Sequence, residues 1–391
     1  MKRVTVITEK DGKRLAAAFA DGRAVSLSVE DPADPPLAGC VFTARVQHRV
    51  GNLDACFAEI RPGEMAFLEV HGAPPAPGSV ITVQVTADRK GDKNARVSGK
   101  LVFSDSLAVL QSGMSHVGVS NKITDEAVRT RLHELADAYM SPEYGFILRT
   151  AAAAAPEEAL KAQLASLAAR YENCKRGQYL QPYSLLDTPD PAWLSSARDA
   201  ILRADALGED LPEIVTDLPA VAEACRSRLP EHLQACVRVY ERTDIALYRV
   251  YGFDKVLSEA TARRVWLPCG GNLVIDRTEA MTVIDVNSAK SVKGKKTKAE
   301  NTLKVDMEAA TEAARQLRLR NLSGIILIDF IDPATPEDEE ELIRHLCREL
   351  GKDPVTAEFV EMTKLHFAVL TRKRVSAPLS EMLAGLSGKE A

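Results

Sequence analysis

The sequence predicts a multidomain α+β protein, and three features of its pattern point to this fold class. Much of the first hundred residues alternates polar and apolar side chains with a period of two, as β-strands do. Residues 125–175 and 192–245 are mostly rich in alanine, leucine and glutamate, which favours helices. From residue 265 the expected order is strand, strand, helix, strand, helix, which is typical of an α/β layer. With 391 residues, the chain is long enough for two to four domains.

The first thirty residues predict a three-stranded meander. Two Asp-Gly pairs, at residues 11–12 and 21–22, lie ten residues apart between apolar runs. Asp-Gly is a preferred sequence for the tight turns of β-hairpins. A proline-rich joint at residues 32–36 then ends the segment.

Residues 36–104 predict a small closed barrel of about five strands. Alternation runs through residues 41–50 and 81–86, and two phenylalanines lie in further short strand candidates between them. Barrels that bind oligonucleotides commonly display aromatic side chains, on which bases stack, with cations nearby for phosphates. The pattern leaves open whether the phenylalanines do this or belong to the core. The candidates for RNA contacts are Phe57, Phe67, Lys90 and Lys93.

Composition excludes several classes of protein. No apolar run reaches the ~18 residues of a membrane-spanning helix, and the N-terminus lacks the apolar stretch of a secretory signal, so we expect a cytoplasmic protein. The seven cysteines are scattered and never spaced Cys-x-x-Cys, which argues against a disulfide framework and a zinc knuckle. Because the net charge is −5, a nucleic-acid site has to come from local basic clusters.

Two predicted strands end in aspartate. Residues 282–287 read Thr-Val-Ile-Asp-Val-Asn, and residues 325–330 read Ile-Ile-Leu-Ile-Asp-Phe. A predicted helix over about 299–319 lies between them, and a strand-helix-strand connection sets two parallel strands side by side. Asp285 and Asp329 are therefore expected at one edge of a sheet, close enough to share a cation.

Magnesium suits such a carboxylate pair, because it binds one or two carboxylates, keeps several waters and accepts phosphate oxygens. The ion would polarise a phosphate and lower the pKa of an attacking water, and Asn287 can orient a bound water without adding charge. The spacing alone also allows a helix cap and a salt bridge. Three basic clusters favour a phosphate track instead: Lys290, Lys293, Lys295, Lys296 and Lys298 after the first strand, Arg315, Arg318 and Arg320 at the end of the helix, and Arg372, Lys373 and Arg374 farther on.

At this point the sequence resembles the ribonuclease E/G family. The resemblance covers nearly the whole chain and is strongest over 259–332, where four stretches match the family's catalytic core nearly position for position. They are Leu-Pro-Cys-Gly-Gly-Asn-Leu-Val-Ile-Asp-Arg-Thr-Glu-Ala at 267–280, Ile-Asp-Val-Asn-Ser-Ala at 284–289, Arg-Gln-Leu-Arg-Leu-Arg at 315–320 and Ile-Asp-Phe-Ile-Asp at 328–332.

The resemblance implies an endoribonuclease that hydrolyses single-stranded, A/U-rich RNA in RNA decay or in rRNA and tRNA processing. Its catalytic residues would be Asp285, Asp329 and Asn287, of which the two aspartates hold Mg²⁺, with Mn²⁺ as a substitute. Two alternatives stay open at this stage. One is a non-catalytic RNA-binding protein that keeps the fold, and the other is a metal-dependent DNA nuclease.

The resemblance also implies binding residues outside the metal site. A pocket that prefers RNA with a 5′-monophosphate matches Val-Gly-Val-Ser at 117–120 and Gly-Phe-Ile-Leu-Arg-Thr at 145–150. Its candidate residues are Gly118, Val119, Arg149, Thr150 and Arg372. RNA contacts are implied for Phe57, Phe67, Lys93 and Lys290, although Lys290 replaces a usual arginine and so loses the bidentate fork.

The implied architecture is a ribonuclease H-like subdomain with an OB-fold barrel inserted in it. The ribonuclease H-like subdomain comprises residues 1–35 plus 197–258, and the barrel comprises residues 36–104. A 5′-sensor region follows at 105–196, then a deoxyribonuclease-I-like catalytic subdomain at 259–378 and a tail at 379–391. The family's zinc link and small domain have no counterpart before Ala391, so neither zinc nor a zinc-linked dimer is expected, and the oligomeric state stays open. Asp306 replaces a common asparagine, either as a further metal ligand or, as we slightly favour, as a surface change.

Overall fold

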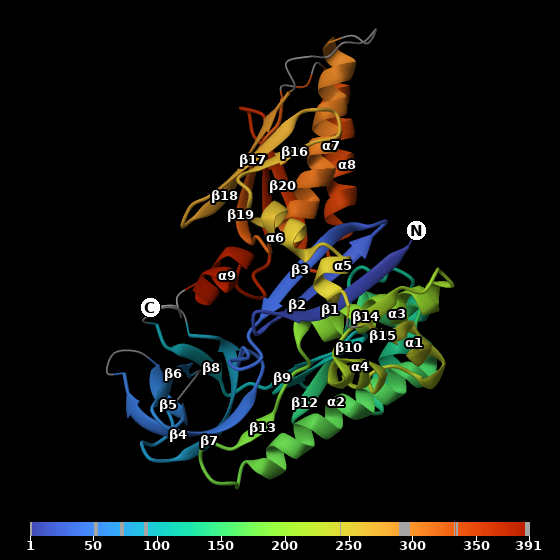
Figure 1. Cartoon of the computed structure of the whole chain (residues 1–391). Helices are drawn as coiled ribbons and strands as arrows, with labels where there is room; N and C mark the ends of the chain where they lie inside the picture. Colours follow the sequence, from blue (N-terminus) through green and yellow to red (C-terminus); the bar gives the residue numbers. More distant parts are fainter. Residues whose placement is uncertain are drawn as a thin grey trace. The chain divides into compact units, whose positions relative to one another are not determined.

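The computed structural model describes residues 2–50, 54–70, 74–89, 93–242, 244–288, 298–331, 333 and 335–387, without the side chains of 298–301 and 384–387. The chain folds into two compact units (Figure 1). One consists of residues 34–211, and the other of residues 1–33 and 212–391. Among the described residues, no helix has the length and apolar character that crossing a membrane requires.

The discontinuous unit begins with the predicted meander. Strands β1 (Arg3–Lys10), β2 (Lys13–Ala20) and β3 (Arg23–Glu30) pair antiparallel. Both residues of each Asp-Gly turn have positive φ, between 48° and 78°, as a tight hairpin turn of type I′ requires. Short parallel strands β14 (Glu213–Thr216) and β15 (Val237–Val239) extend the sheet to the order β15-β14-β1-β2-β3.

Several short helices lie near this sheet. They are α4 (Pro219–Arg226), η2 (Glu231–Cys236), α5 (Leu247–Val250), α6 (Phe253–Thr261) and α9 (Leu379–Ser387). The prediction that residues 192–245 are mostly helical is therefore wrong for β14 and β15. Each has only three or four residues and pairs with a strand that is remote in sequence or equally short, so no local periodicity shows it.

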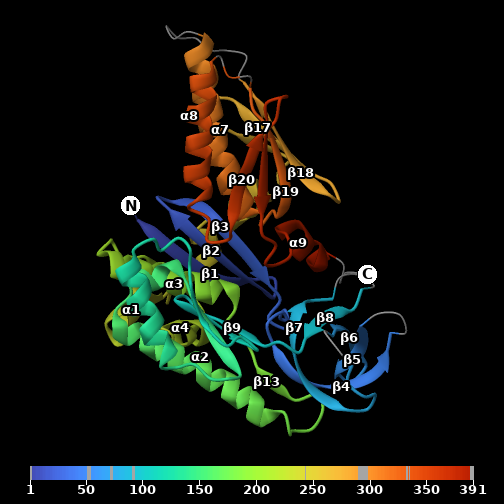
Figure 2. The same ribbon diagram turned by 180° about the vertical axis from the view of Figure 1, so that it is seen from behind.

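The second sheet of this unit has the order β16-β17-β18-β19-β21-β20. Helices α7 (Lys298–Leu319) and α8 (Pro336–Leu350) run along one of its faces (Figure 2) and share one apolar core with it. The predicted strand-helix-strand connection is confirmed, because β18 and β19 pair in parallel on either side of α7 in the chain. The strands are β16 (Arg264–Trp266), β17 (Asn272–Arg277), β18 (Met281–Asn287), β19 (Gly324–Asp329), β20 (Ala357–Met362) and β21 (Phe367–Arg372).

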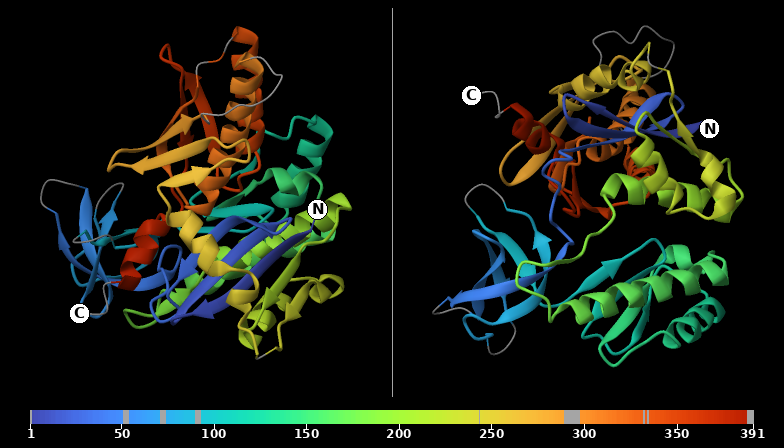
Figure 3. Two further views of the ribbon diagram at one scale, coloured as in Figure 1. Left: turned by 45° about the horizontal axis from the view of Figure 1, so that its top comes forward. Right: turned by 60° about the horizontal axis from the view of Figure 1, so that its bottom comes forward.

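The other unit contains the predicted five-stranded barrel, drawn in blue and cyan in Figure 3. Pairing of β4 with β7 closes it, and alternate side chains of every strand fill its core. Strand β13 (Leu185–Asp187) adds to the outside edge of β4. The barrel strands are β4 (Val41–Arg49), β5 (Ala55–Arg61), β6 (Glu64–Glu69), β7 (Val80–Ala87) and β8 (Ala95–Ser98).

The rest of this unit is a four-stranded sheet, in the order β11-β12-β10-β9, with helices packed on it. Its strand β12 (Tyr144–Leu148) lies in a region that we predict to be helical, and that prediction is wrong there. The remaining elements are β9 (Val102–Ser104), β10 (Ala108–Ser112), β11 (Val117–Val119), α1 (Glu126–Asp137), η1 (Thr150–Ala153), α2 (Glu157–Gly177) and α3 (Ala192–Leu207).

Candidate active site

The two strand-end aspartates are direct neighbours across the parallel pair β18 and β19. The register runs from Met281 opposite Ile325 to Asp285 opposite Asp329, on strands about 4.8 Å apart. Alternate residues of β18, such as Ile284, are buried against α7 and α8, whereas Asp285 is half-buried and alternates with them. Because strand side chains alternate between faces, both carboxylates lie on the face opposite these helices. They form the carboxylate pair of the candidate site.

Asn287 is tied to this pair. Its Nδ2 donates a hydrogen bond to Asp285 Oδ2 over 2.6 Å, which fixes the orientation of both side chains. In the neighbouring strand β17, Asn272 lies directly opposite Asn287, and its Oδ1 is buried without a hydrogen-bond partner among the described residues. Gly271 allows the turn before β17 to come this close, because a Cβ there would lie 2.8 Å from the carbonyl oxygen of Asn287.

Asp306 supports the site from behind. It lies on α7 with only 1% of its surface exposed, and its Oδ1 accepts a 3.1 Å hydrogen bond from the backbone nitrogen of Ile331, two residues after Asp329. The interpretation of Asp306 as a surface change is therefore wrong. Among the described side chains, no group of three or more histidine, cysteine, aspartate or glutamate residues is placed to hold a metal ion.

The two segments proposed for the 5′-phosphate pocket lie side by side. Strand β11 pairs in parallel with β12, with Gly118 opposite Ile147. The hydroxyl oxygens of Ser120 and Thr150 are 3.1 Å apart, and Arg149 is exposed at the end of β12. Arginine and hydroxyl groups are donors that bind phosphate, and Arg149 directly precedes Thr150 in the chain.

A glycine and an arginine hold these segments together. A Cβ at Gly145 would overlap the carbonyl oxygen of His116, so only glycine allows β12 to lie this close to the chain before β11. Arg129 on α1 donates 3.0 Å hydrogen bonds to the carbonyl oxygens of Ser120 and Ile123. We did not predict Arg129 from the sequence, because its role depends on where α1 packs.

On the barrel, Phe57 and Phe67 face outward rather than into the core. They lie opposite each other on β5 and β6, with ring centroids 5.6 Å apart. Their strand neighbours, such as Cys56 and Leu68, fill the barrel, while both phenylalanines are half-buried and outside the core cluster. The alternative that both are core residues is therefore wrong. Lys93 is exposed shortly before β8.

Two further residues extend this pair into a row across four strands. His48 lies opposite Phe57, with ring centroids 5.0 Å apart, and exposed Arg96 lies opposite Phe67. We did not predict a role for His48, because simple alternation groups it with buried Val46. An irregularity in the pairing between Val46 and His48 shifts the register and turns His48 outward. We call His48, Phe57, Phe67 and Arg96 the stacking row.

Comparison with known proteins agrees with this arrangement. The sequence profile of the ribonuclease E/G family matches residues 103–375, which is more than half of the chain. The chain belongs to the ribonuclease E/G family. It is 30% identical to ribonuclease E of Synechocystis sp. over 98% of its own length and 58% of that protein. It is 28% identical to ribonuclease E of Escherichia coli strain K12, covering 97% of this chain and 38% of that protein.

The chain is also 28% identical to ribonuclease G of Escherichia coli strain K12, over 94% of this chain and 79% of that protein. It thus spans only about half of the length of the ribonuclease E relatives that it matches. These similarities extend well beyond the profile match, because they include the barrel and the N-terminal meander.

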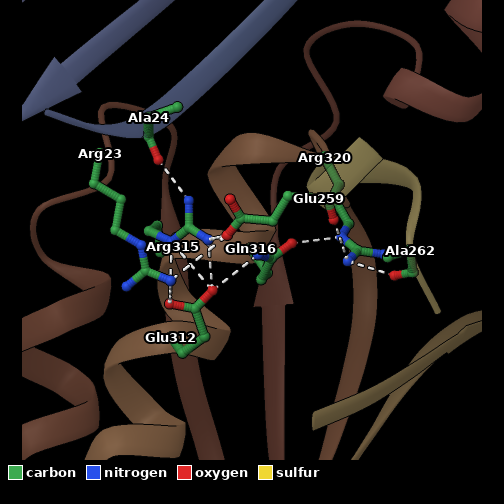
Figure 4. A network of polar contacts seen from close by, with 8 residues as sticks. All are labelled: Arg23, Ala24, Glu259, Ala262, Glu312, Arg315, Gln316 and Arg320. Atoms are coloured by element: carbon green, nitrogen blue, oxygen red, sulfur yellow. Dashed lines mark hydrogen bonds and ion pairs between the residues drawn. The ribbon is translucent and has the colours of Figure 1, made fainter. Parts of the chain in front are cut away.

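Within this family member, the arginines of α7 do not form a phosphate track. Arg315 is buried, and its Nε donates to both carboxylate oxygens of Glu312, over 3.1 and 3.0 Å. The same guanidinium donates to the carbonyl oxygen of Ala24 and pairs with Glu259, and Arg23 adds an ion pair to Glu312 (Figure 4). This network ties α7 to β3 and α6, so the phosphate-binding prediction is wrong for Arg315.

The other two arginines of this cluster, Arg318 near the end of α7 and Arg320 directly after it, have structural partners as well. Arg320 donates to the carbonyl oxygens of Glu259 and Ala262, over 3.1 and 2.7 Å, and to the side chain of Gln316 (Figure 4). Burial, together with the positive charge of Arg315, lowers the pKa of Arg320 to about 10, so the group stays charged at neutral pH. Arg318 is half-buried and directed at a backbone carbonyl of α8.

Arg372 also differs from the expectation. Its guanidinium makes hydrogen bonds of 2.9 and 3.3 Å to Asp353 and of 2.9 and 3.0 Å to Asn321 Oδ1 and the carbonyl oxygen of Leu322. The side chains of Arg372 and Asp353 are only 4% and 1% exposed. The structure therefore contradicts a phosphate-binding role for Arg372, because the guanidinium is buried and uses its donors within the fold.

Some predicted residues cannot be placed. Lys90, Lys290, Lys293, Lys295 and Lys296 lie outside the described residues, as does the side chain of Lys298. The structure thus brings together Asp285, Asp329 and Asn287 at one edge, and Gly118, Val119, Arg149 and Thr150 at another. Phe57 and Phe67 lie side by side on the outside of the barrel.

Proposed function

We propose that this protein is a magnesium-dependent endoribonuclease that cuts single-stranded RNA at the carboxylate pair. The observation that supports this most is the register of Asp285 and Asp329 on adjacent parallel strands, with Asn287 hydrogen-bonded to Asp285. Two carboxylates held side by side repel each other unless a proton or a cation lies between them. Membership of the ribonuclease E/G family supports RNA as the substrate.

The donor set at the pair fits Mg²⁺, with Mn²⁺ as a substitute. Both ions prefer oxygen ligands, and Mg²⁺ needs only one or two carboxylates because it keeps several waters. The unsatisfied Oδ1 of Asn272 beside Asn287 is a further reason to expect an ordered water shell here. When bound, the ion would supply charge for the phosphate and a more acidic water. The chain's own contribution is to hold the carboxylates in register and to orient Asp285 through Asn287.

The surface of the barrel supports binding of unpaired RNA. The stacking row offers two phenylalanine rings, a histidine ring and Arg96 across four adjacent strands. Each base stacked on an aromatic side chain contributes about 1–3 kcal/mol, and this needs a base that is not paired. Exposed Lys93 and Arg96 add charge for phosphates. The proposal also includes A/U-rich single strands as substrates. It places the protein in the cytoplasm, with a role in RNA decay or in rRNA and tRNA processing.

The cleavage test compares the wild type with an Asp285→Asn, Asp329→Asn double variant on a short A/U-rich RNA with Mg²⁺. We expect internal cleavage by the wild type alone, and its loss when Mg²⁺ is chelated. Asp276→Asn is the matched control, because Asp276 is exposed on β17 and ion-paired with Arg263. This control variant should cleave the RNA normally. RNA binding without magnesium-dependent cleavage would overturn the proposal and indicate a non-catalytic RNA-binding protein. Equal cleavage of single-stranded DNA of the same sequence would argue against RNA as the substrate.

A preference for a 5′-monophosphate is the second part of the proposal, and Arg149 and Thr150 would carry it. We expect the wild type to cut monophosphorylated RNA faster than RNA with a 5′-hydroxyl, and Arg149→Ala to reduce that ratio toward one. Arg176→Ala removes an exposed arginine of α2 in the same unit and should leave the ratio unchanged. If both arginine variants keep the ratio, the pocket does not sense the 5′ end.

A further inference from the structure

An exposed tryptophan and an arginine lie on β16, the edge strand of the sheet that carries the carboxylate pair. Trp266, at the end of β16, is 63% exposed. The guanidinium carbon of Arg264 lies over its ring, 5.8 Å from the centroid. Single exposed apolar residues are common on protein surfaces, so exposure alone means little. The position of these two side chains in the sheet is what gives them significance.

The strand register places both residues on the same face as the carboxylate pair. Arg264 lies opposite Val274, Val274 lies opposite Asp285, and Asp285 lies opposite Asp329. Opposite residues on neighbouring strands point to the same face. The burial pattern agrees, because Val265 between them is packed in the core with α7 and α8. Arg264 is therefore two strands from Asp285, roughly 10 Å at the usual strand spacing.

A second row leads from the tryptophan to the asparagine of the site. Trp266 lies opposite Asn272, and Asn272 lies opposite Asn287, which is bonded to Asp285. The aromatic ring and the guanidinium thus flank the carboxylate pair from one side, along two adjacent rows of the same surface. An exposed ring, a cation and two carboxylates thus lie on one face of four adjacent strands, β16, β17, β18 and β19.

We propose that Arg264 and Trp266 bind the RNA strand beside the linkage that is cut, with Trp266 stacked on an unpaired base and Arg264 on a backbone phosphate. This rests on the proposed function, since it assumes that RNA crosses the carboxylate pair. A tryptophan ring provides a stacking surface for any base, and an arginine fork matches phosphate oxygens. The two residues are RNA-binding residues of the catalytic sheet, separate from the stacking row of the barrel.

The chemistry of the contact favours single strands. A base in a duplex is already stacked and paired, so it cannot stack on Trp266 without the cost of opening the helix. The contact would also hold the strand in one direction across the pair, because base and phosphate are read by different side chains. Trp266 is therefore expected to act on substrate affinity and on the choice of cleavage position.

The test uses the emission of Trp266 itself. The chain has two tryptophans, and Trp193 is only 8% exposed, so Trp193→Phe leaves Trp266 as the sole reporter. In the Asp285→Asn, Asp329→Asn background, which we expect to bind RNA without cutting it, a short single-stranded A/U-rich RNA should quench this emission, and the same strand in a duplex should not. If Trp193→Phe disturbs folding, the protein that keeps Trp193 gives the same information. Iodide should quench the emission of the exposed Trp266, and bound RNA should reduce this quenching.

Variants with active carboxylates test the role in catalysis. Trp266→Ala should raise KM roughly 5- to 150-fold, the change that corresponds to one lost stacking contact, with a smaller change in kcat. Trp266→Phe should recover much of the affinity. Arg264→Ala should weaken binding and its salt dependence, whereas Arg263→Ala should not, since Arg263 is exposed but already paired with Asp276 over 2.6 Å.

The outcomes separate this proposal from the proposed function. Normal cleavage by the wild type with no quenching and an unchanged KM for Trp266→Ala would overturn the role of Trp266 and leave the nuclease intact. Quenching by RNA without any cleavage would retain the binding site and sink the nuclease. If Trp266→Ala changes the molecular mass in solution but not RNA binding, the exposed edge contacts a second copy of the chain, and the proposal fails.

Discussion

The buried pair of Arg372 and Asp353 allows a sharp test of whether Arg372 serves the fold or the substrate. Substitution Arg372→Met removes four hydrogen bonds and leaves Asp353, whose side chain is 1% exposed, without its positive partner. Loss of one partner of a buried ion pair costs about 3–5 kcal/mol, mainly because the remaining charge is buried alone. In a unit of this size that corresponds to a fall in Tm of roughly 6–20 °C.

The measurement is unfolding of the whole chain by urea and by heat, followed by circular dichroism. The combined variant Arg372→Met, Asp353→Leu is the control, because replacing both charges by apolar side chains is often close to neutral. We expect the single variant to be much less stable than the double variant. The reasoning is refuted if Arg372→Met unfolds like the wild type and loses only the preference for 5′-monophosphate RNA, since that result belongs to a phosphate-binding arginine.

Three other predictions concern stability and reactivity. Asp306→Ala should lower the free energy of unfolding by about 1–3 kcal/mol, because the backbone N–H of Ile331 loses its acceptor, and an unchanged urea midpoint would contradict this. Gly145→Ala should destabilise the protein, since its Cβ would overlap a backbone oxygen, whereas Gly118→Ala, whose nearest neighbour is 3.6 Å away, should unfold nearly normally. Burial raises the pKa of Cys174 to about 12. Because the thiolate is the reactive form, iodoacetamide at pH 8 should label exposed Cys347 before Cys174. Equal labelling rates of the two cysteines would refute the burial of Cys174.

Local sequence was sufficient for the elements whose signal is local. The Asp-Gly turns, the alternation of the barrel strands and the helix expected over about 299–319 predict structure correctly, because turn chemistry and periodicity act over a few residues. The carboxylate pair could be predicted for the same reason, since a strand-helix-strand connection sets two parallel strand ends together. The short strands β12, β14 and β15 were missed, because strands of three to five residues depend on partners elsewhere in the chain.

The roles of individual side chains were decided only by the tertiary structure. The sequence shows that Arg315 and Arg372 carry charge, but not that carboxylates from other elements surround them in the interior. Asp306 looks like a surface change until α7 packs against the end of β19. A shift in strand pairing turns His48 outward against the periodic pattern. Which side chains are buried, and which groups they bond, depend on contacts between residues far apart in the chain. The local sequence around a residue does not specify these contacts.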